Sequence, residues 1–206
     1  LLHYIKINTY YKSKFKTMKT MKIALTLILI ITSSVLFAQK SIINTEKSSI
    51  DWVGKKIGGQ HNGEIKIKNG SLELKNDQII AGNFTIDMNS ITCKDLKDDV
   101  YNQKLVGHLK SDDFFGVAKF PTATLKVTSA TKFINDSAAI TGEITIKGKT
   151  ESITFDLIRN NKMYTAKIDV DRSKFNVKYG STSFFDSLGD KAIDDIFNLN
   201  VKLMVN

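Results

Sequence analysis

GHLKSDDFFGVAKFPTATLKV, residues 107–127, marks the point where the chain changes from a helical to an extended pattern. The apolar residues between Val100 and Leu109 are spaced as on one face of a short helix. Pro121 is the only proline in the chain, and because it cannot donate to a β ladder we expect it at the first position of a strand. After it, apolar and polar residues alternate as far as Val127, which is typical of a half-buried strand.

Period-two alternation covers most of the remaining chain, as expected for strands that bury one face. Within 80–88 it places Ile80, Phe84 and Ile86 on the same face. The segments with this pattern are 48–54, 60–68, 72–74, 80–88, 122–127, 138–147, 153–157, 166–170 and 197–205.

Residues that favour turns separate the strands. Asp98 or Asp99 is placed to cap the N-terminus of the helix, and residues 171–190 show no regular pattern. Pairs that are typical of tight turns occur at Asn69-Gly70, Asn76-Asp77, Asn135-Asp136, Gly148-Lys149 and Asn160-Asn161.

These patterns predict an all-β fold of about eight or nine strands with one short helical excursion. Strands joined by two-residue turns are antiparallel neighbours, and without helices to cover them they must close into a barrel or pair into two sheets. The barrel is favoured because closure removes the exposed edges. Eight strands enclose a space that is either packed solid or holds one small ligand.

Residues 1–38 differ in character from the remaining chain and are predicted to precede the fold. Residues 1–17 begin with leucine, contain four lysines and no acidic residue, and are interpreted as an over-extended reading frame. Lys19 and Lys22 then form a basic region before the mostly apolar segment 23–35, which is the pattern of a secretory signal peptide.

The apolar segment is shorter than the roughly 20 residues that a membrane-spanning helix needs, and polar residues interrupt it. We therefore expect no stable membrane span. Cleavage near Ala38 would release a single domain covering residues 39–206, located in the periplasm or secreted.

The basic character of the chain belongs mostly to the N-terminal segment. The formal net charge is +9, and it falls to +3 once the six lysines of residues 1–38 are excluded, since that segment has no acidic residue. The net charge of the chain is therefore no argument for nucleic-acid binding, because a nucleic-acid-binding protein needs a basic patch on its folded domain. Cys93 is the only cysteine, so the chain has no internal disulfide framework.

Six stretches of sequence together cover most of the region after residue 47. They are SSIDWVGKK at 48–56, HNG at 61–63, FTIDMNSI at 84–91, SDDFFGVAKFPTATLKV at 111–127, ITGEITIKGKTESITFDL at 140–157, and DRSKFNVKYGS with DDIFNLNVKL between 171 and 203. In this order and spacing they resemble the YceI-like family of exported bacterial proteins, which are described as binding polyisoprenoids or lipids. The resemblance implies a lipocalin-like antiparallel barrel, a helix at one end of an elongated cavity, a long apolar ligand inside it, and no established catalytic residues.

A predicted ligand tunnel follows from the inward strand faces and from the aromatic residues after the helix. Each of its residues taken alone is equally explained as packed core. Several inward positions carry glycine or alanine, which leaves room for a ligand but also marks bends or close strand approach. Each buried CH₂ contributes about 0.8 kcal/mol, so a few isoprene units can bind without polar chemistry. The tunnel residues are Trp52, Phe84, Ile86, Phe114, Phe115, Phe120, Leu125, Ile144 and Phe155.

Two polar residues are added to this predicted ligand-binding set. His61 shares the parity of apolar neighbours in its strand and is predicted to contact a ligand head group at the mouth of the barrel; the alternative is an imidazole satisfied by the backbone. Arg172 either clamps an anionic head group or forms a salt bridge to a nearby carboxylate. We interpret His108 and Asp112-Asp113 as helix-end residues and Cys93 as a lone thiol.

Motifs of common enzymes are absent from the sequence. It contains no G-x-S-x-G elbow, P-loop or G-x-G-x-x-G, and its histidines and cysteine lack zinc-site spacing. We therefore predict a binding protein without catalytic residues, cofactor or metal, whose ligand is a polyisoprenoid, an isoprenoid quinone or a related lipid. Two alternatives stay open, a structural or stress-response interaction protein with a solid-packed barrel and an enzyme acting on the bound lipid. Homodimerisation through Phe184-Phe185 or an edge strand also stays open.

Overall fold

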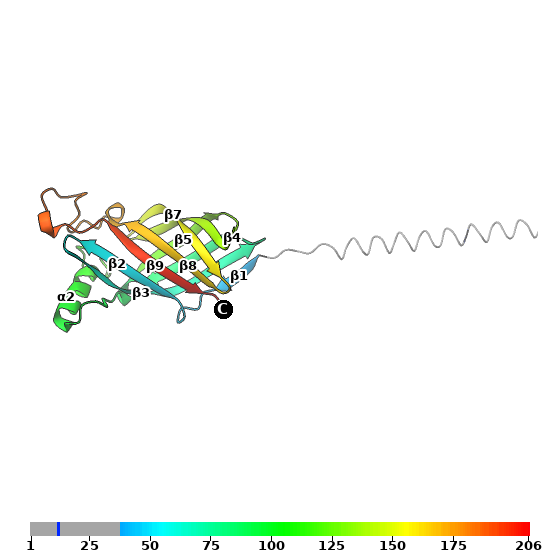
Figure 1. The fold of residues 1–206 in the computed structure, drawn as a ribbon, viewed down its shortest axis with the longest axis horizontal. Helices are drawn as coiled ribbons and strands as arrows, with labels where there is room; N and C mark the ends of the chain where they lie inside the picture. The colour runs from blue at the N-terminus through cyan, green and yellow to red at the C-terminus, as the bar shows by residue number, and fades with distance from the viewer. Residues whose placement is uncertain (1–11, 13–37) are drawn as a thin grey trace, which may run out of the picture. The chain divides into compact units, whose positions relative to one another are not determined.

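The computed structural model describes residue 12 and residues 38–206 (Figure 1). The predicted reading-frame extension and signal peptide lie outside this range, apart from residue 12 and Ala38 at its edge. No helix in the described part of the chain is long and apolar enough to cross a membrane. Residues 38–206 contain β1 (Gln39–Ile42), β2 (Ser49–Lys56), β3 (Gly59–Lys75), β4 (Gln78–Asp87), η1 (Met88–Ser90), α2 (Asp99–Lys110), β5 (Thr122–Ala130), β6 (Ser137–Ile146), β7 (Lys149–Asn160), β8 (Met163–Asp171), η2 (Arg172–Phe175), η3 (Gly189–Lys191) and β9 (Ile196–Met204).

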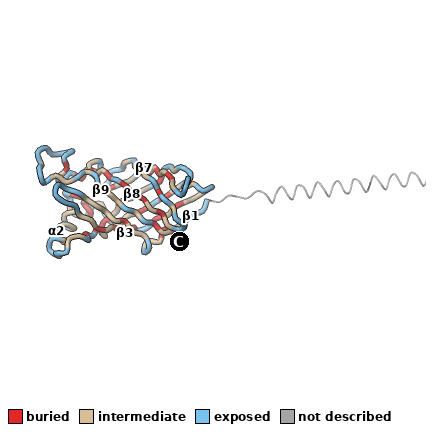
Figure 2. The backbone as a smooth tube through the Cα atoms, in the orientation of Figure 1, coloured by how far each residue is buried: buried red, intermediate tan, exposed pale blue. Residues whose placement is uncertain are grey.

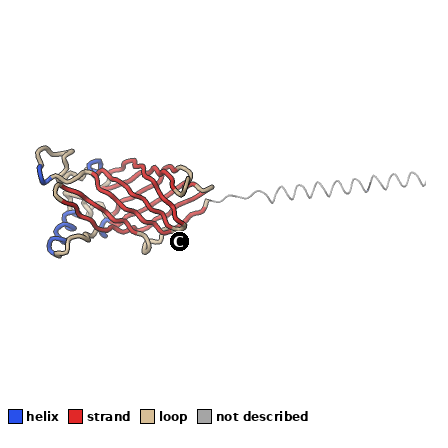
Figure 3. The backbone as a smooth tube through the Cα atoms, in the orientation of Figure 1, coloured by secondary structure: helices blue, strands red, loops and turns tan. Residues whose placement is uncertain are grey.

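Eight of these strands form a closed antiparallel barrel. Strands β2, β9, β8, β7, β6, β5, β4 and β3 are neighbours in that order, and β3 completes the ring because it pairs with both β4 and β2. The short β1 adds to the second half of β3. Each barrel strand thus pairs on both sides, although β7 and β8 pair only between Leu157–Asn160 and Met163–Ala166. The predicted all-β, lipocalin-like antiparallel barrel of about eight strands with one helical excursion is confirmed (Figure 3).

Strand β3 runs straight through the predicted hairpin at Asn69-Gly70, so that prediction is wrong. A tight hairpin turn of this kind needs positive φ, and neither residue has it. The glycine instead allows side chains of neighbouring segments to pack closely on β3, since a Cβ added at Gly70 would lie 2.8 Å from Phe84 Cδ1 and 3.0 Å from Ile43 Cγ1. A shift in register between Ile67 and Asn69 forms a bulge at the same point.

The other predicted turns are present, two of them displaced by one residue. Asn76-Asp77 and Asn135-Asp136 have positive φ at both residues, which fits the tight turns of antiparallel neighbours. The turn predicted at Gly148-Lys149 lies one residue earlier, at Lys147-Gly148. The turn predicted at Asn160-Asn161 lies one residue later, at Asn161-Lys162. Short polar pairs therefore predict where these connections occur, but not which two residues form each turn.

The alternation predicted for residues 80–88 fails at Ile80, the first residue of that segment. Ile80 is 46% exposed, whereas Ile79 is 1% exposed. The pairing of β4 with β3 shifts register between Glu73 and Leu74, and this irregularity reverses the parity of the first residues of β4. From Gly82 onward the alternation follows the prediction.

Helix α2 lies at one end of the barrel, which we call the mouth; β1 and the C-terminus lie toward the opposite end (Figure 1). Asp98 caps the helix as predicted, since its carboxylate accepts hydrogen bonds from the backbone N–H groups of Val100 and Tyr101 at 2.9 and 3.1 Å. The long connection between β8 and β9 also lies at the mouth. Phe184 and Phe185 are exposed in that connection, and dimerisation through them stays a prediction.

Candidate ligand cavity

The inside of the barrel contains two adjacent cavities. The middle cavity has a volume of about 80 Å³, and the mouth cavity, which lies beneath α2 and the segment that follows it, has a volume of about 140 Å³. The two are neighbouring parts of one interior space because five residues line both, namely Ile50, Ile86, Ala123, Ile144 and Leu199.

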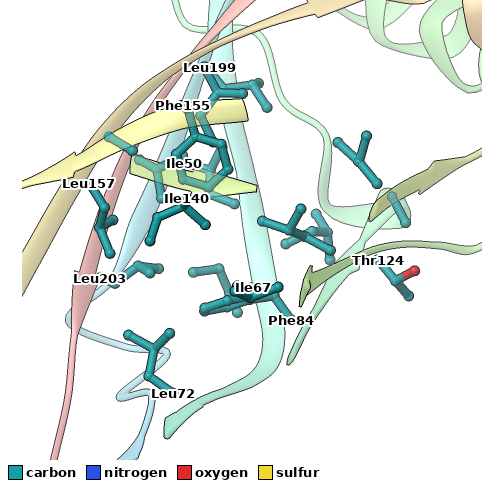
Figure 4. A pocket seen from close by; sticks show the side chains of 18 of the residues that line it. Ile50, Ile67, Leu72, Phe84, Thr124, Ile140, Phe155, Leu157, Leu199 and Leu203 are labelled. Atoms are coloured by element: carbon teal, nitrogen blue, oxygen red, sulfur yellow. The ribbon is translucent and has the colours of Figure 1, made fainter. Parts of the chain in front are cut away.

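The wall of the middle cavity is almost entirely apolar. Inward-facing side chains of successive strands converge on it, among them Ile140, Phe155 and Leu157 (Figure 4). Thr124 is the one residue of its lining with a polar side chain. An apolar molecule placed here would exchange water for hydrocarbon contacts on every side.

Ile144 and Leu199, which line both cavities, are less buried than other inward-facing side chains of their strands. On β6, Ile140 and Ile146 are 1% and 6% exposed, whereas Ile144 between them is only partly buried. On β9, Leu203 is buried, whereas Leu199 is partly buried. Figure 2 shows buried residues interspersed with intermediate and exposed ones along the strands. Because a solid core would bury these side chains more evenly, Ile144 and Leu199 mark the open space that the two cavities share.

Aromatic side chains from the segment after α2 close the mouth cavity. Phe114 and Phe115 line it and pack edge to face with ring centroids 5.1 Å apart, and Phe115 also packs against Phe197. Lys147 holds this segment from the β6–β7 turn, because its Nζ donates to the carbonyl oxygens of Phe114 at 2.6 Å and Asp112 at 2.9 Å. Burial lowers the pKa of the Lys147 ammonium group.

Arg172, at the edge of the mouth cavity, is fully engaged by the protein. It is 2% exposed, and its Nη2 also lies 3.3 Å from Oδ1 of Asp195. Burial lowers the pKa of the guanidinium, and the charge of Asp195 opposes this effect. This geometry fits the salt-bridge role that the sequence left open, and four of the five guanidinium N–H groups are used by backbone carbonyl oxygens. The guanidinium donates to four carbonyl oxygens at 2.7 to 3.2 Å, those of Val177, Tyr179, Ile193 and Asp194.

The Asp195 carboxylate is held as an anion beside Arg172. Its Oδ2 accepts a hydrogen bond from Ser183 Oγ at 2.6 Å, while Oδ1 is within ion-pair distance of Arg172 without being aligned for a hydrogen bond. Burial alone would raise the pKa of this carboxyl group, but the hydroxyls of Ser181 and Ser183 and the charge of Arg172 outweigh it, and the pKa is lowered.

Most residues of the predicted ligand-binding set border the two cavities. His61 and Phe120 line neither of them. As ligand contacts, all eleven residues stay predictions. Phe84, Leu125 and Phe155 line the middle cavity, Trp52, Phe114, Phe115 and Arg172 line the mouth cavity, and Ile86 and Ile144 line both.

His61 lies at the mouth but faces the segment that connects η1 to α2. Its Nδ1 is 2.8 Å from Oδ2 of Asp95. The segment reaches β3 because Gly63 has no side chain, since a Cβ there would lie 1.8 Å from the carbonyl oxygen of Thr92. Trp52 Nε1 donates to the same carbonyl oxygen at 3.0 Å. Strand parity therefore places His61 on the correct face but cannot reveal the segment that covers it.

Phe120 packs outside the two cavities, against the β6–β7 turn. A Cβ added at Gly148 would lie 2.9 Å from its ring. Phe120 precedes Pro121 and β5, so the alternation of that strand does not determine its direction. Its inclusion in the predicted set rested on its proximity to the aromatic pair in the sequence.

Sequence reasoning missed several residues of the cavity wall. Ile50 and Leu199 line both cavities, and the alternation of their strands could have identified them. Met88, Ile91 and Leu109 line the mouth cavity from η1, the segment after it and α2. The alternation of residues 80–88 places Met88 on the inward face, whereas no sequence pattern predicts the positions of Ile91 and Leu109, because these depend on how the connection between β4 and β5 folds over the mouth.

The chain matches the family model described as the YceI-like domain over residues 42–205. Among characterised sequences, it is 37% identical over 86 residues to Protein YceI of Salmonella arizonae, a match that covers 42% of this chain and 41% of that protein. The same values hold for Protein YceI of Salmonella paratyphi B. The matched segment thus spans about two fifths of the length of these relatives.

Solved structures share the fold of this chain. Burkholderia cenocepacia BcnA superposes with a TM-score of 0.63 and 23% sequence identity, over 80% of this chain and 99% of that protein. A polyisoprenoid binding domain from Saccharophagus degradans, implicated in plant cell wall breakdown, has a TM-score of 0.53 and 13% identity, over 82% of this chain and 99% of that domain. At these identities the likeness concerns the barrel fold alone.

Proposed function

This chain belongs to the YceI-like domain family, and we propose that it sequesters or carries a long apolar molecule inside its barrel. The ligand class is a polyisoprenoid, an isoprenoid quinone or a related lipid. The observation that carries the proposal is the interior space whose wall is apolar and whose side chains, such as Ile144 and Leu199, stay partly exposed. Each ligand CH₂ buried against this wall contributes about 0.8 kcal/mol.

The polyisoprenoid class enters the proposal from a structural relative. The domain from Saccharophagus degradans is described as binding polyisoprenoids, and it shares the barrel fold with this chain. In the chain itself, the apolar middle cavity supports the same class, because a hydrocarbon chain needs no polar partner there. A ligand tail in the middle cavity would leave its polar end toward the mouth.

The cavity walls support binding rather than catalysis. A general acid or base must lie within reach of the substrate with a suitable pKa. Apart from Asp194, which lines the mouth cavity, the polar groups of the two linings offer no such acid or base. Thr124 offers one hydroxyl, Arg172 donates to backbone carbonyl oxygens, and Trp52 donates to Thr92. We therefore assign no chemical step to this barrel.

Export is part of the proposal. It rests on the basic Lys19 and Lys22 followed by the apolar segment 23–35. Fractionation of the native host, with mass measurement of the mature N-terminus, tests it. A protein that starts near residue 39 and lies in the periplasm or the medium supports export, and an uncleaved protein inside the cell contradicts it.

Mass spectrometry of an organic extract tests the ligand proposal. We expect protein purified without detergent from a native-like host to contain a long-chain lipid near one equivalent, or to take up added polyprenol or quinone. Ile144→Trp should fill the interior and reduce lipid retention roughly tenfold, equivalent to about 1.4 kcal/mol. Ile158→Trp is the matched control, because Ile158 is exposed on β7 and its replacement should leave retention unchanged.

A lipid-free extract with no uptake of either lipid would overturn the proposal. It would favour the alternative of a structural or stress-response interaction protein that uses its outer surface. Equal retention by the wild type and Ile144→Trp would place any bound lipid outside the two cavities.

A further inference from the structure

Three potential metal ligands from two separate segments of the chain meet beside the mouth of the barrel. His61 belongs to β3, and Cys93 and Asp95 belong to the segment between η1 and α2. One ligand atom from each of the three side chains lies within 4.8 Å of those of the other two. The Cys93 Sγ is 3.3 Å from Asp95 Oδ1, and His61 Nδ1 is 2.8 Å from Asp95 Oδ2.

Imidazole nitrogen, thiolate sulfur and carboxylate oxygen are the three ligand types that Zn²⁺ takes in proteins. With a neutral imidazole, the thiolate and the carboxylate supply two negative charges, which balance one divalent cation. Lys94 lies between Cys93 and Asp95 in the sequence, but its ammonium group pairs with Asp51 and Glu64, at 3.1 Å each. Its positive charge is therefore already compensated away from the three ligand atoms.

The cluster combines a shielded sulfur with ligands that solvent can reach. Cys93 is buried, whereas the side chains of His61 and Asp95 are 31% and 27% exposed. A cation can thus enter from the solvent side, and a water molecule can complete a four-coordinate site there. None of the three side chains lines the middle or the mouth cavity, so the cluster is separate from the proposed lipid site.

We propose that His61, Cys93 and Asp95 bind one Zn²⁺ ion, with water as the fourth ligand. On binding, the Cys93 thiol releases its proton to solvent and its sulfur forms the bond to zinc. Two oxygen or nitrogen ligands of a tetrahedral zinc lie about 3.3 Å apart when their bonds are about 2.0 Å long. The 2.8 Å contact between His61 and Asp95 therefore needs to open by only about half an ångström.

The ion would fasten the covering segment to the barrel wall. Asn102 of α2 donates its side-chain N–H to the carbonyl oxygens of Cys93 at 3.0 Å and Leu96 at 2.9 Å, so the ligand segment also supports the helix. A bond network from His61 through the ion to Cys93 would connect β3 to α2. Zinc binding should thus reduce hydrogen exchange in residues 91–110.

Cobalt spectroscopy on the untagged full chain, reduced and purified free of metal, tests this site. Co²⁺ bound to a thiolate absorbs in the near ultraviolet, and since Cys93 is the only cysteine, that absorption reports Cys93 directly. We expect it to saturate at one equivalent of Co²⁺ and to disappear when Zn²⁺ is added. Cys93→Ser should abolish it, and His61→Ala should weaken Co²⁺ binding by about tenfold or more.

His108→Ala is the matched control, because His108 lies on α2, where its ring contacts Phe114 and Tyr179; it should bind Co²⁺ like the wild type. The absence of a thiolate absorption from the folded wild type would overturn the proposal without any variant. Unchanged Co²⁺ affinity in folded His61→Ala would also overturn it, and would leave His61 and Asp95 as a structural pair only.

Discussion

The middle of the barrel and its mouth differ in how completely their side chains are matched to neighbours. In the middle, apolar side chains such as Ile144 and Leu199 border open space. At the mouth, Arg172 has four carbonyl acceptors and a carboxylate, and Lys147 has two carbonyl acceptors. A buried polar group left without a partner costs about 1–3 kcal/mol, whereas apolar surface left open remains available to a ligand.

This difference assigns separate roles to the two regions. Polar pairing at the mouth fixes the long β8–β9 connection and the segment after α2 over the barrel. Incomplete apolar packing in the middle provides the space for a ligand. Substitutions in the two regions should therefore differ in cost, and three comparisons test this, in order of decreasing effect.

Replacement of Arg172 should have the largest effect on stability. Arg172→Met keeps an aliphatic side chain but leaves Asp195, whose side chain is only 15% exposed, without its partner, together with four carbonyl oxygens that lose their donor. We expect the free energy of unfolding to fall by about 3–5 kcal/mol, the usual effect of breaking a buried ion pair. Urea denaturation followed by circular dichroism measures it.

Arg159→Met is the matched control for this change. Arg159 pairs with Asp77 and Asp136, whose side chains are 60% and 65% exposed, so water replaces the lost partner. The loss of stability should be clearly smaller than for Arg172→Met. Equal losses for the two variants would show that pairing at the mouth is no more important than pairing on the surface.

Two isoleucines on the same face of β6 allow the packing of the middle to be compared directly. Ile140 is 1% exposed, and Ile140→Ala should cost about 2–5 kcal/mol of unfolding free energy, as for other buried isoleucines. Ile144→Ala should cost less, because Ile144 already lacks neighbours on its cavity side. The same urea experiment measures both. A loss for Ile144→Ala as large as that for Ile140→Ala would mean that the middle is packed as tightly as a solid core.

The period of the sequence predicts these two isoleucines correctly, because alternation along one strand is a local property. The same local reasoning fails where a neighbouring strand decides the outcome. Asn69-Gly70 reads as a hairpin turn, but pairing on β3 continues through it, and the register shift near Glu73 changes which residues of β4 face inward. The sequence of one strand does not show where the neighbouring strands have bulges or register shifts.

The candidate sites show the same limit. The apolar wall of the cavities was largely predictable, because each strand contributes its share independently of the others. The partners of Arg172 and the meeting of His61 with Cys93 and Asp95 were not, since they depend on two connections that fold back over the mouth. Spacing along the sequence therefore gave no indication of a metal site, although the fold brings its three side chains together.

Acid should remove part of the stability that the mouth derives from Asp195. The pKa of this carboxyl group is lowered in the folded protein, so its stabilising effect is complete above the unfolded-state pKa of about 3.9 and is lost as the pH falls through the lower folded-state value. Asp195→Asn lacks this titration. The wild type should thus exceed Asp195→Asn in stability by an amount that is constant near neutral pH and shrinks below about pH 4.

Urea denaturation of the wild type and Asp195→Asn at several pH values between about 2 and 7 measures this difference. Ser183→Ala sharpens the result, because it removes the hydroxyl that donates to Asp195 Oδ2 at 2.6 Å while Arg172 stays in place. The folded-state pKa of Asp195 should then rise toward its usual value, so the loss of stability on acidification should be smaller than in the wild type and complete at a higher pH. A gap between wild type and Asp195→Asn that does not change with pH would show that the Arg172–Asp195 pair does not hold the carboxylate in its charged form, and that the mouth, like the middle, is held by packing rather than by charge.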